Sequence, residues 1–321
     1  MTFAVVFPGQ GSQSVGMLSE LAKTSSQVKT TFEEAADVLG VDLWKLSQES
    51  SAEALNDTVV TQPLMFTSGV AVWRALREAG MPMPSAVAGH SLGEFSALVA
   101  AESMQFRDGL TLVQQRAKLM AQAVPEGEGG MAALIGLEDD TVVSLCESVS
   151  GARVSEAVNF NAPGQVVISG HLDALQETIS SAREQGCKRA LMLAVSVPNH
   201  SSLMRKAGEQ LGKTIDSLSF GQPVLPLLQN NTARAASQLE DMLTHLKEHV
   251  FSPVYWTRTI ARLRDEHAVT TLLEAGPGKV LTGLSRRIDR ALPAMPVYSP
   301  ETLEEAVAVV CGAMEERVPS T

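Results

Sequence analysis

A serine between two glycines is the feature that most constrains the fold of this chain. Residues 86–101 read AVAGHSLGEFSALVAA, with a short apolar run before the serine and helix formers after it. Ser91 therefore lies where a strand turns into a helix. The spacing Gly-x-Ser-x-Gly permits such a sharp turn, because glycine lets neighbouring backbone pass without a Cβ clash. The turn places the serine hydroxyl at a helix N-terminus, where the partial positive charge favours a developing oxyanion.

Strands and helices alternate around this turn. Residues 3–7 form an apolar run that stops at Pro8-Gly9, which indicates a buried first strand followed by a turn. Residues 13–23 and 27–40 are predicted to be helical. Another predicted helix begins with Thr61 as its cap and Pro63 in its first turn. This alternation favours an α/β fold with a mostly parallel sheet that is covered on both faces.

A small inserted subdomain is predicted after the composition break at residues 125–130, Pro-Glu-Gly-Glu-Gly-Gly. The order of predicted elements is β-α-β-β-α-β, which is the ferredoxin-like arrangement. These elements cover residues 131–135, 139–149, 154–160, 165–169, 172–184 and 189–195. We therefore predict a large subdomain of residues 1–127 and 197–315, a small subdomain of residues 128–196 and a frayed tail of residues 316–321.

Composition excludes several classes of function. The net charge of −11 argues against nucleic-acid binding, which needs clustered Lys and Arg. The three cysteines, Cys146, Cys187 and Cys311, lie far apart and show no metal-binding spacing, so no metal is expected. No apolar run is long enough to cross a membrane, and the N-terminus lacks a signal peptide pattern. The sequence thus predicts a cytoplasmic protein with no membrane association.

A serine hydroxyl becomes a good nucleophile only when a base takes its proton. Among the six histidines, His200 stands in a loop after Pro198, and loops often carry site residues. The turn Pro8-Gly-Gln-Gly11 follows the first strand and could present a second backbone amide to an oxyanion. Arg116 is predicted on a helix, either as a solvated side chain or as a buried guanidinium that binds a carboxylate. A structural turn, a structural histidine and a surface arginine remain the alternative interpretations.

Five stretches together resemble the malonyl-CoA:acyl carrier protein transacylase family, in the same order over residues 2–290. They are Phe7-Pro-Gly-Gln-Gly-Ser-Gln13, Gly89-His-Ser-Leu-Gly-Glu94, Asn161-Ala-Pro-Gly-Gln-Val-Val-Ile-Ser-Gly170, Val197-Pro-Asn-His200 and Glu274-Ala-Gly-Pro-Gly-Lys-Val-Leu-Thr-Gly283. The resemblance implies an α/β-hydrolase-like subdomain with a ferredoxin-like insertion. It also implies transfer of a malonyl group from malonyl-CoA to acyl carrier protein in fatty acid biosynthesis, without a metal or redox cofactor. We expect a monomer.

The resemblance also implies roles for individual residues. Ser91 is the acylated nucleophile, and His200 is its base and later the acid. The backbone amides of Gln10 and Leu92 form the oxyanion hole, and Arg116 binds the malonyl carboxylate. Two further positions, Gln62 and Asn161, match the family near the substrate pocket.

Two positions depart from the family pattern. Asn199 replaces the Ser or Phe that often precedes the base, and His249 replaces a Gln upstream of Pro253-Val-Tyr-Trp256 whose backbone carbonyl orients the histidine. No third carboxylate is evident, which favours a Ser/His dyad over a triad.

The expected carrier protein is acidic, so we expect a local basic surface at Lys279, Arg286, Arg287 and Arg290. Three kinds of enzyme remain as alternatives: an acyltransferase of polyketide synthesis, the malonyltransferase subunit of a malonate decarboxylase, and a serine hydrolase or thioesterase. A non-catalytic interaction module is the alternative outside enzymes.

Overall fold

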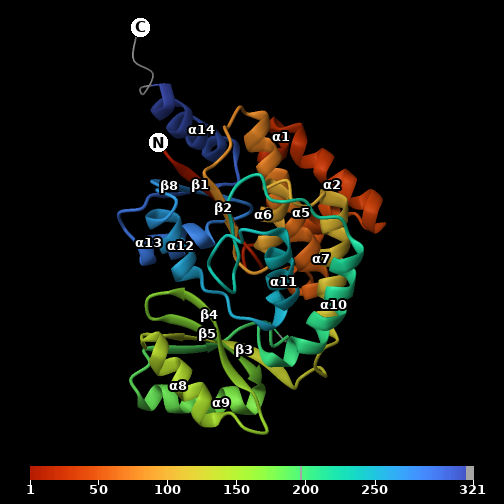
Figure 1. Cartoon of the computed structure of the whole chain (residues 1–321). Coiled ribbons are helices and arrows are strands. Elements are labelled where there is room, and N and C mark those ends of the chain that lie inside the picture. Colours follow the sequence, from red (N-terminus) through yellow and green to blue (C-terminus); the bar gives the residue numbers. More distant parts are fainter. Residues whose placement is uncertain (196, 316–321) are drawn as a thin grey trace. The chain divides into compact units, whose positions relative to one another are not determined.

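The computed structural model describes residues 1–195 and 197–315, which form two compact units (Figure 1). The first unit comprises Met1–Gln114, Ser219–Leu228 and the chain from Ala261 onward. The second comprises Gln115–Leu218 and Gln229–Ile260. Two helices, α7 (Phe106–Ala121) and α12 (Trp256–Asp265), contain residues of both units. The predicted tail of residues 316–321 lies outside the described residues, and the predicted subdomain boundaries stay a prediction.

The first unit contains a five-stranded sheet in the order β7-β2-β1-β8-β9, and every neighbouring pair is parallel. Its strands are β1 (Phe3–Phe7), β2 (Ala86–Gly89), β7 (Leu227–Leu228), β8 (Thr271–Ala275) and β9 (Ala294–Val297). Phe7 is in register with Gly89, and Val6 with Glu274. Since parallel strands end at the same edge of a sheet, the Pro8 turn, the Ser91 turn and the loop after Glu274 share that edge.

Helices of the first unit pack on this sheet and on one another. They are α1 (Leu21–Thr24), α2 (Ser26–Leu39), α3 (Leu43–Glu49), α4 (Ala52–Asn56), α5 (Thr58–Glu78), α6 (Gly93–Ala100), α13 (Val280–Ile288) and α14 (Pro300–Glu315). Helix α6 packs on both β1 and β2, and α5 packs on α6. The packing of α5 and α6 gives the short β2 and its turn a rigid support.

Two predicted helix boundaries were wrong. Residues 15–20 form turns, and α1 begins only at Leu21. Helix α5 begins three residues before Thr61, because Asp57 caps it by accepting a bond from the Val59 amide. The Thr61 hydroxyl instead bonds to the backbone carbonyls of Leu55 and Asp57. Pro63 is therefore inside the helix, in its second turn, where it has no N–H to donate to the Val59 carbonyl four residues earlier.

The second unit contains an antiparallel sheet in the order β4-β5-β3-β6. Its elements are β3 (Gly129–Ile135), α8 (Asp139–Val149), β4 (Ser155–Ala162), β5 (Gln165–His171), α9 (Leu172–Glu184), β6 (Arg189–Met192), η1 (Ser202–Met204), α10 (Arg205–Ser217), α11 (Leu239–Glu248) and η2 (His249–Phe251). The helices α8 and α9 lie on one side of this sheet (Figure 1). The first six elements follow the predicted β-α-β-β-α-β order, and α8 and α9 match the predicted ranges.

Each face of the antiparallel sheet has its own apolar cluster. On the face toward α8 and α9, Leu134, Val166 and Ile168 pack with Leu175. On the opposite face, Met131, Ala133, Val158 and Val167 form a smaller cluster. Alternate residues along each strand thus point to opposite faces, as expected for strands that are buried on both sides. No helix in the described part of the chain is long and apolar enough to span a membrane.

Candidate active site

Ser91 occupies a strained turn between β2 and α6. Its φ is +50°, a left-handed conformation that costs a non-glycine residue about 1–3 kcal/mol. The backbone amide of His90 donates to the carbonyl of Phe7 at 2.9 Å, and the Glu94 amide donates to the Ser91 carbonyl at 3.0 Å. These bonds tie the turn to the end of β1 and to the first turn of α6. The strain is therefore held by the surrounding structure, and Ser91 remains partly exposed to solvent.

The two glycines of the turn have no room for a side chain. A Cβ on Gly89 would lie 1.9 Å from the Gly93 carbonyl carbon, and a Cβ on Gly93 would lie 2.0 Å from the Phe7 carbonyl oxygen. Both contacts are with backbone, which cannot move aside without displacing β1 or α6. The Gly-x-Ser-x-Gly spacing is thus required by the packing of this turn.

We expect Gly93→Ala to lower the free energy of unfolding by about 3 kcal/mol or more, because the new methyl group collides with the backbone of Phe7. The matched control is Gly283→Ala on α13, where a Cβ meets nothing within 4 Å. That change should be neutral or should stabilise the protein by up to about 1 kcal/mol through helix propensity. Denaturant midpoints measure both changes, and equal midpoints for the two variants would contradict the packing argument.

Two backbone amides adjoin this turn, those of Gln10 and Leu92. A Cβ on Gly9 would lie 2.6 Å from the His90 carbonyl oxygen and 3.6 Å from the Leu92 nitrogen, so the Pro8 turn and the Ser91 turn are in close contact. Within the described chain, neither the Gln10 amide nor the Leu92 amide donates to an acceptor. Leu92 stands directly before α6, whose N-terminus carries partial positive charge. Two open N–H groups at such a place suit a developing oxyanion.

The buried carboxylate of Glu274 holds the neighbouring loop. It accepts bonds from the Leu281 amide at 3.0 Å and from the Thr282 amide and hydroxyl at 2.7 Å each. Burial raises the pKa of this carboxyl group, and these hydrogen bonds oppose the rise only in part. The carboxylate thereby caps α13 and fixes Gly276 beside Pro8, since a Cβ on Gly276 would lie 2.7 Å from the Pro8 ring. The Pro8 turn, which carries Gln10, is thus supported by the loop that follows β8.

His200 lies in the second unit, buried to 2% exposure, with a φ of +65°. Its Nδ1 lies 3.1 Å from the His249 carbonyl oxygen and 3.1 Å from the Ser252 carbonyl oxygen. Because a carbonyl can only accept a hydrogen bond, Nδ1 must carry the proton in the neutral ring. Nε2 is then the unprotonated nitrogen and is available as a base. The hydrogen bond uses the backbone carbonyl of residue 249, and the His249 ring also packs edge-on against the His200 ring, with 5.5 Å between the ring centroids.

The other predicted residues are all buried. Arg116 lies on α7 with 2% exposure, and a guanidinium in such a place must meet an anionic or polar group. Gln62 lies on α5 with 1% exposure, and its Nε2 donates to the Thr58 hydroxyl at 2.9 Å. Asn161 lies on β4 with 8% exposure, beside a shift in register with β5. Gln10, Gln62, Ser91 and Leu92 thus belong to the first unit, and Arg116, Asn161 and His200 to the second.

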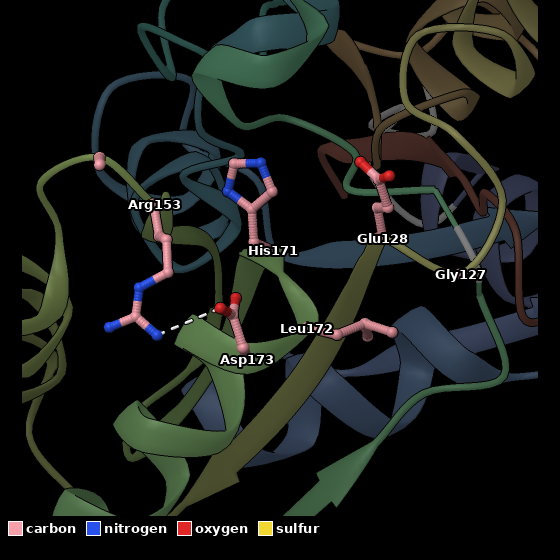
Figure 2. A pocket seen from close by; sticks show the side chains of 7 residues that line it. Gly127, Glu128, Arg153, His171, Leu172 and Asp173 are labelled. Atoms are coloured by element: carbon pink, nitrogen blue, oxygen red, sulfur yellow. Dashed lines mark hydrogen bonds and ion pairs between the residues drawn. The ribbon is translucent and has the colours of Figure 1, made fainter.

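One open pocket of about 340 Å³ contains none of these residues (Figure 2). It lies in the second unit, where β5 ends and α9 begins. Its lining residues are Gly127, Glu128, Ala152, Arg153, His171, Leu172 and Asp173. The Arg153 guanidinium points toward Asp173 at 3.2 Å, and both side chains are exposed (Figure 2). Among residues 1–195 and 197–315, no group of three or more His, Cys, Asp or Glu side chains could hold a metal ion.

Comparison with known proteins identifies the family. The sequence profile of the acyl transferase domain matches residues 4–314. The chain belongs to this family. A malonyl CoA-acyl carrier protein transacylase of Salmonella typhimurium is 45% identical over 305 residues, which cover 95% of this acyltransferase and 98% of the relative. The resemblance predicted from the five motifs is therefore confirmed.

Solved structures agree with this assignment. An acyl carrier protein S-malonyltransferase of Vibrio cholerae has a TM-score of 0.92 and 44% identity, with 95% of this chain and 100% of that chain covered. A malonyl-transacylase solved in complex with a type II PKS acyl-carrier protein has a TM-score of 0.94 and 44% identity, with 96% and 100% covered. The predicted fold class, a parallel α/β sheet with a separate ferredoxin-like sheet, is confirmed for this acyltransferase.

Sequence reasoning missed one charged group near His200. Glu156 on β4 accepts two hydrogen bonds from Ser202, two residues after the histidine. A signal was present, because the strand alternation places Glu156 on the same face as the buried Val158. A carboxylate on a face that otherwise buries apolar side chains needs a partner.

Proposed function

We propose that this acyltransferase moves a malonyl group from malonyl-CoA to the phosphopantetheine thiol of acyl carrier protein, in fatty acid biosynthesis. The observation that carries the proposal is the strained turn at Ser91, where the backbone amides of Gln10 and Leu92 have no acceptor within the described chain. A turn that served only to reverse the chain would need neither the serine nor the open donors. The names of the relatives supply the substrates.

In the first half-reaction, Nε2 of His200 takes the proton of the Ser91 hydroxyl, and Oγ attacks the thioester carbon. The tetrahedral oxyanion accepts hydrogen bonds from the amides of Gln10 and Leu92; loss of one such donor typically slows a reaction about 10²–10³-fold. The carbon–sulfur bond then breaks. The CoA thiolate takes the proton from His200, and a malonyl ester remains on Ser91. The proposal requires Nε2 to reach hydrogen-bonding distance of Ser91 Oγ during this step.

In the second half-reaction, His200 takes the proton of the phosphopantetheine thiol, and the thiolate attacks the ester carbon. The carbon–oxygen bond breaks, Ser91 regains its proton from His200, and malonyl-carrier protein leaves. The reaction is ping-pong, and no group outside the chain and its two substrates takes part. The buried guanidinium of Arg116 binds the free carboxylate of the malonyl group through two parallel hydrogen bonds. Gln62 and Asn161 line the substrate pocket in this proposal.

The exposed face of α13, together with the residues that flank the helix, is the proposed docking surface for an acidic carrier protein. The side chains of Lys279, Arg286, Arg287 and Arg290 are all exposed, as is Val280 at 44%. An apolar residue within a basic surface suits a partner that combines acidic and apolar side chains. Complementary charge matters most for the association rate, and salt weakens it.

We expect the double variant Arg286→Glu/Arg287→Glu to raise the KM for carrier protein by about tenfold at low salt, because like charges then face each other. The KM for malonyl-CoA and the rate of acylation of the protein should stay unchanged. Lys23→Glu/Lys45→Glu makes the same change in net charge at two exposed ion-paired positions and is the control. An unchanged carrier-protein KM in the α13 variant would rule out this surface.

A carrier protein of polyketide synthesis is the second candidate acceptor, favoured by the related malonyl-transacylase solved with such a partner. Competition between the two kinds of carrier protein decides this point, since each gives its own kcat/KM.

We further propose that the enzyme acts in the cytoplasm as a monomer. Incubation with radiolabelled malonyl-CoA and carrier protein tests the function: the label should pass to the carrier protein faster than it is released as free malonate. A serine hydrolase would release malonate at a rate that equals or exceeds transfer.

A further inference from the structure

Strand β4 holds the chain segment that carries the two carbonyl groups facing the His200 ring. The Val254 amide donates to the Val158 carbonyl at 2.7 Å, and the Phe160 amide donates to the Val254 carbonyl at 2.9 Å. Asn159 and Val254 form a parallel β-bridge at the same place. His249 and Ser252, whose carbonyls face Nδ1, stand a few residues before Val254 on this segment. The hydrogen-bond acceptors of the imidazole are therefore fixed relative to β4.

The same strand also holds the loop that carries the imidazole itself. The Ser202 amide donates to one carboxylate oxygen of Glu156 at 2.7 Å, and the Ser202 hydroxyl donates to the other at 2.7 Å. Two residues before His200, the Pro198 ring packs on β3, since a Cβ on Gly129 would lie 2.7 Å from its Cδ. His200 is thus held on both sides by the sheet of the second unit.

From these contacts we infer that Glu156 is a positioning residue for His200 and acts through Ser202. The inference rests on the proposed role of His200 as the base. Hydrogen bonds to a carboxylate are shorter and stronger than those between neutral groups, and two of them fix orientation as well as distance. This restraint is needed because His200 has a φ of +65°, a conformation that persists only when its surroundings enforce it.

The neighbours of Glu156 support a dedicated role. Its partner across the sheet is Ser169, which is fully buried. Within the described chain, the Ser169 hydroxyl has no hydrogen-bond partner. The Glu156 carboxylate therefore bonds to the loop of the histidine even though a buried hydroxyl lies on the adjacent strand. A carboxylate whose only role was to give a buried group of the sheet a hydrogen-bond partner would bond to the Ser169 hydroxyl.

The test replaces Glu156 with alanine and measures kcat and KM separately. We expect kcat for malonyl transfer to fall about 10- to 100-fold, since a misplacement of about 1 Å has an effect of this size. The KM for malonyl-CoA should change less than about twofold, because Glu156 does not touch the substrate in this proposal. Glu156→Gln keeps the shape and can still accept the bond from the Ser202 amide, so it should restore most of kcat.

A direct readout of the ring separates positioning from general stability. In the ¹⁵N spectrum of the His200 imidazole, the parent protein should show one dominant tautomer with the proton on Nδ1. Glu156→Ala should shift the ring nitrogens toward a mixture of tautomers. Glu177→Ala is the matched control, because Glu177 makes a 2.6 Å ion pair with Arg153 in the same unit but lies at the exposed surface. This control should change neither kcat nor the spectrum.

A double-mutant cycle tests whether Glu156 affects kcat through Ser202. Ser202→Ala removes one of the two bonds and should lower kcat less than Glu156→Ala does. In the Glu156→Ala background, Ser202→Ala should have no further effect, because the two residues act as one unit. Additive losses would show that Glu156 acts by another route and would overturn the inference.

The failure of this inference differs from a failure of the proposed function. If the parent protein transfers malonyl groups but Glu156→Ala matches the Glu177→Ala control in kcat and in the ring spectrum, only the positioning role is wrong. If the parent protein transfers nothing, the proposed function is wrong, while the tautomer shift in Glu156→Ala still decides whether Glu156 orders the ring.

Discussion

The Ser91→Ala variant is expected to acquire no covalent label from radiolabelled malonyl-CoA and to lose malonyl transfer by about 10⁵-fold or more. The reason is that the ester forms on Oγ, and no other group in the proposal can carry the malonyl group between the two thiols. The backbone should be undisturbed, because alanine tolerates the turn about as well as serine does. The unfolding midpoint should therefore stay close to that of the parent protein.

Ser96→Ala provides the control for this loss. Ser96 lies on the same helix, α6, is buried, and its hydroxyl makes a 3.4 Å bond to the Phe66 carbonyl. This variant should label and transfer as the parent does. Label that persists in Ser91→Ala, at the parent's stoichiometry, would place the nucleophile on another residue.

The Arg116→Ala variant is expected to change which acyl group the enzyme prefers. A hydrogen bond to a charged group contributes about 1.5–3 kcal/mol, so its loss should lower kcat/KM for malonyl-CoA about 10- to 100-fold. Acetyl-CoA has no free carboxylate, and its kcat/KM should fall little or should rise. The measured quantity is the ratio of the two kcat/KM values, which cancels any loss of active protein.

Two further variants serve as controls for this result. Arg116→Met keeps most of the buried volume and should show the same change in ratio if the charge is what matters. Arg107→Ala removes an exposed arginine from the first turn of the same helix, α7, and should leave the ratio unchanged. A ratio that is the same in Arg116→Ala and in the parent would show that Arg116 does not bind the malonyl carboxylate.

Much of the fold follows from local sequence. The Ser91 turn was predictable because so sharp a strand-to-helix turn needs glycine on both sides of the serine; a Cβ on Gly89 or Gly93 would lie only 1.9 or 2.0 Å from backbone atoms. Helices α8 and α9 were predictable because apolar residues recur at helical spacing along each of them, and this pattern stops where the helix ends. Strand β9 was not predicted, since its sequence Ala-Met-Pro-Val contains a proline, which a strand tolerates only at the edge of a sheet.

The site was less predictable because its contacts are distant in sequence. The nitrogen of His200 meets carbonyls that lie 49 and 52 positions further along the chain, and no local pattern specifies that distance. The Glu156–Ser202 contact spans 46 positions and depends on how β4 packs against the loop. The motifs were enough to propose His200 as a base. Its tautomer follows only from the carbonyls that face Nδ1, and the hydrogen bonds that hold its loop are visible only in the structure. The catalytic roles themselves stay predictions until the variants are measured.

The most direct test of the account is a pulse and chase with malonyl-CoA. The protein is incubated with radiolabelled malonyl-CoA alone, freed of excess substrate and digested, and the labelled peptide is sequenced by mass spectrometry. We expect a malonyl ester on Ser91, and in an undigested sample we expect phosphopantetheinylated carrier protein to remove the label at the rate of turnover. A label on any other residue, or one that passes to water as fast as to the carrier protein, would contradict the proposed mechanism.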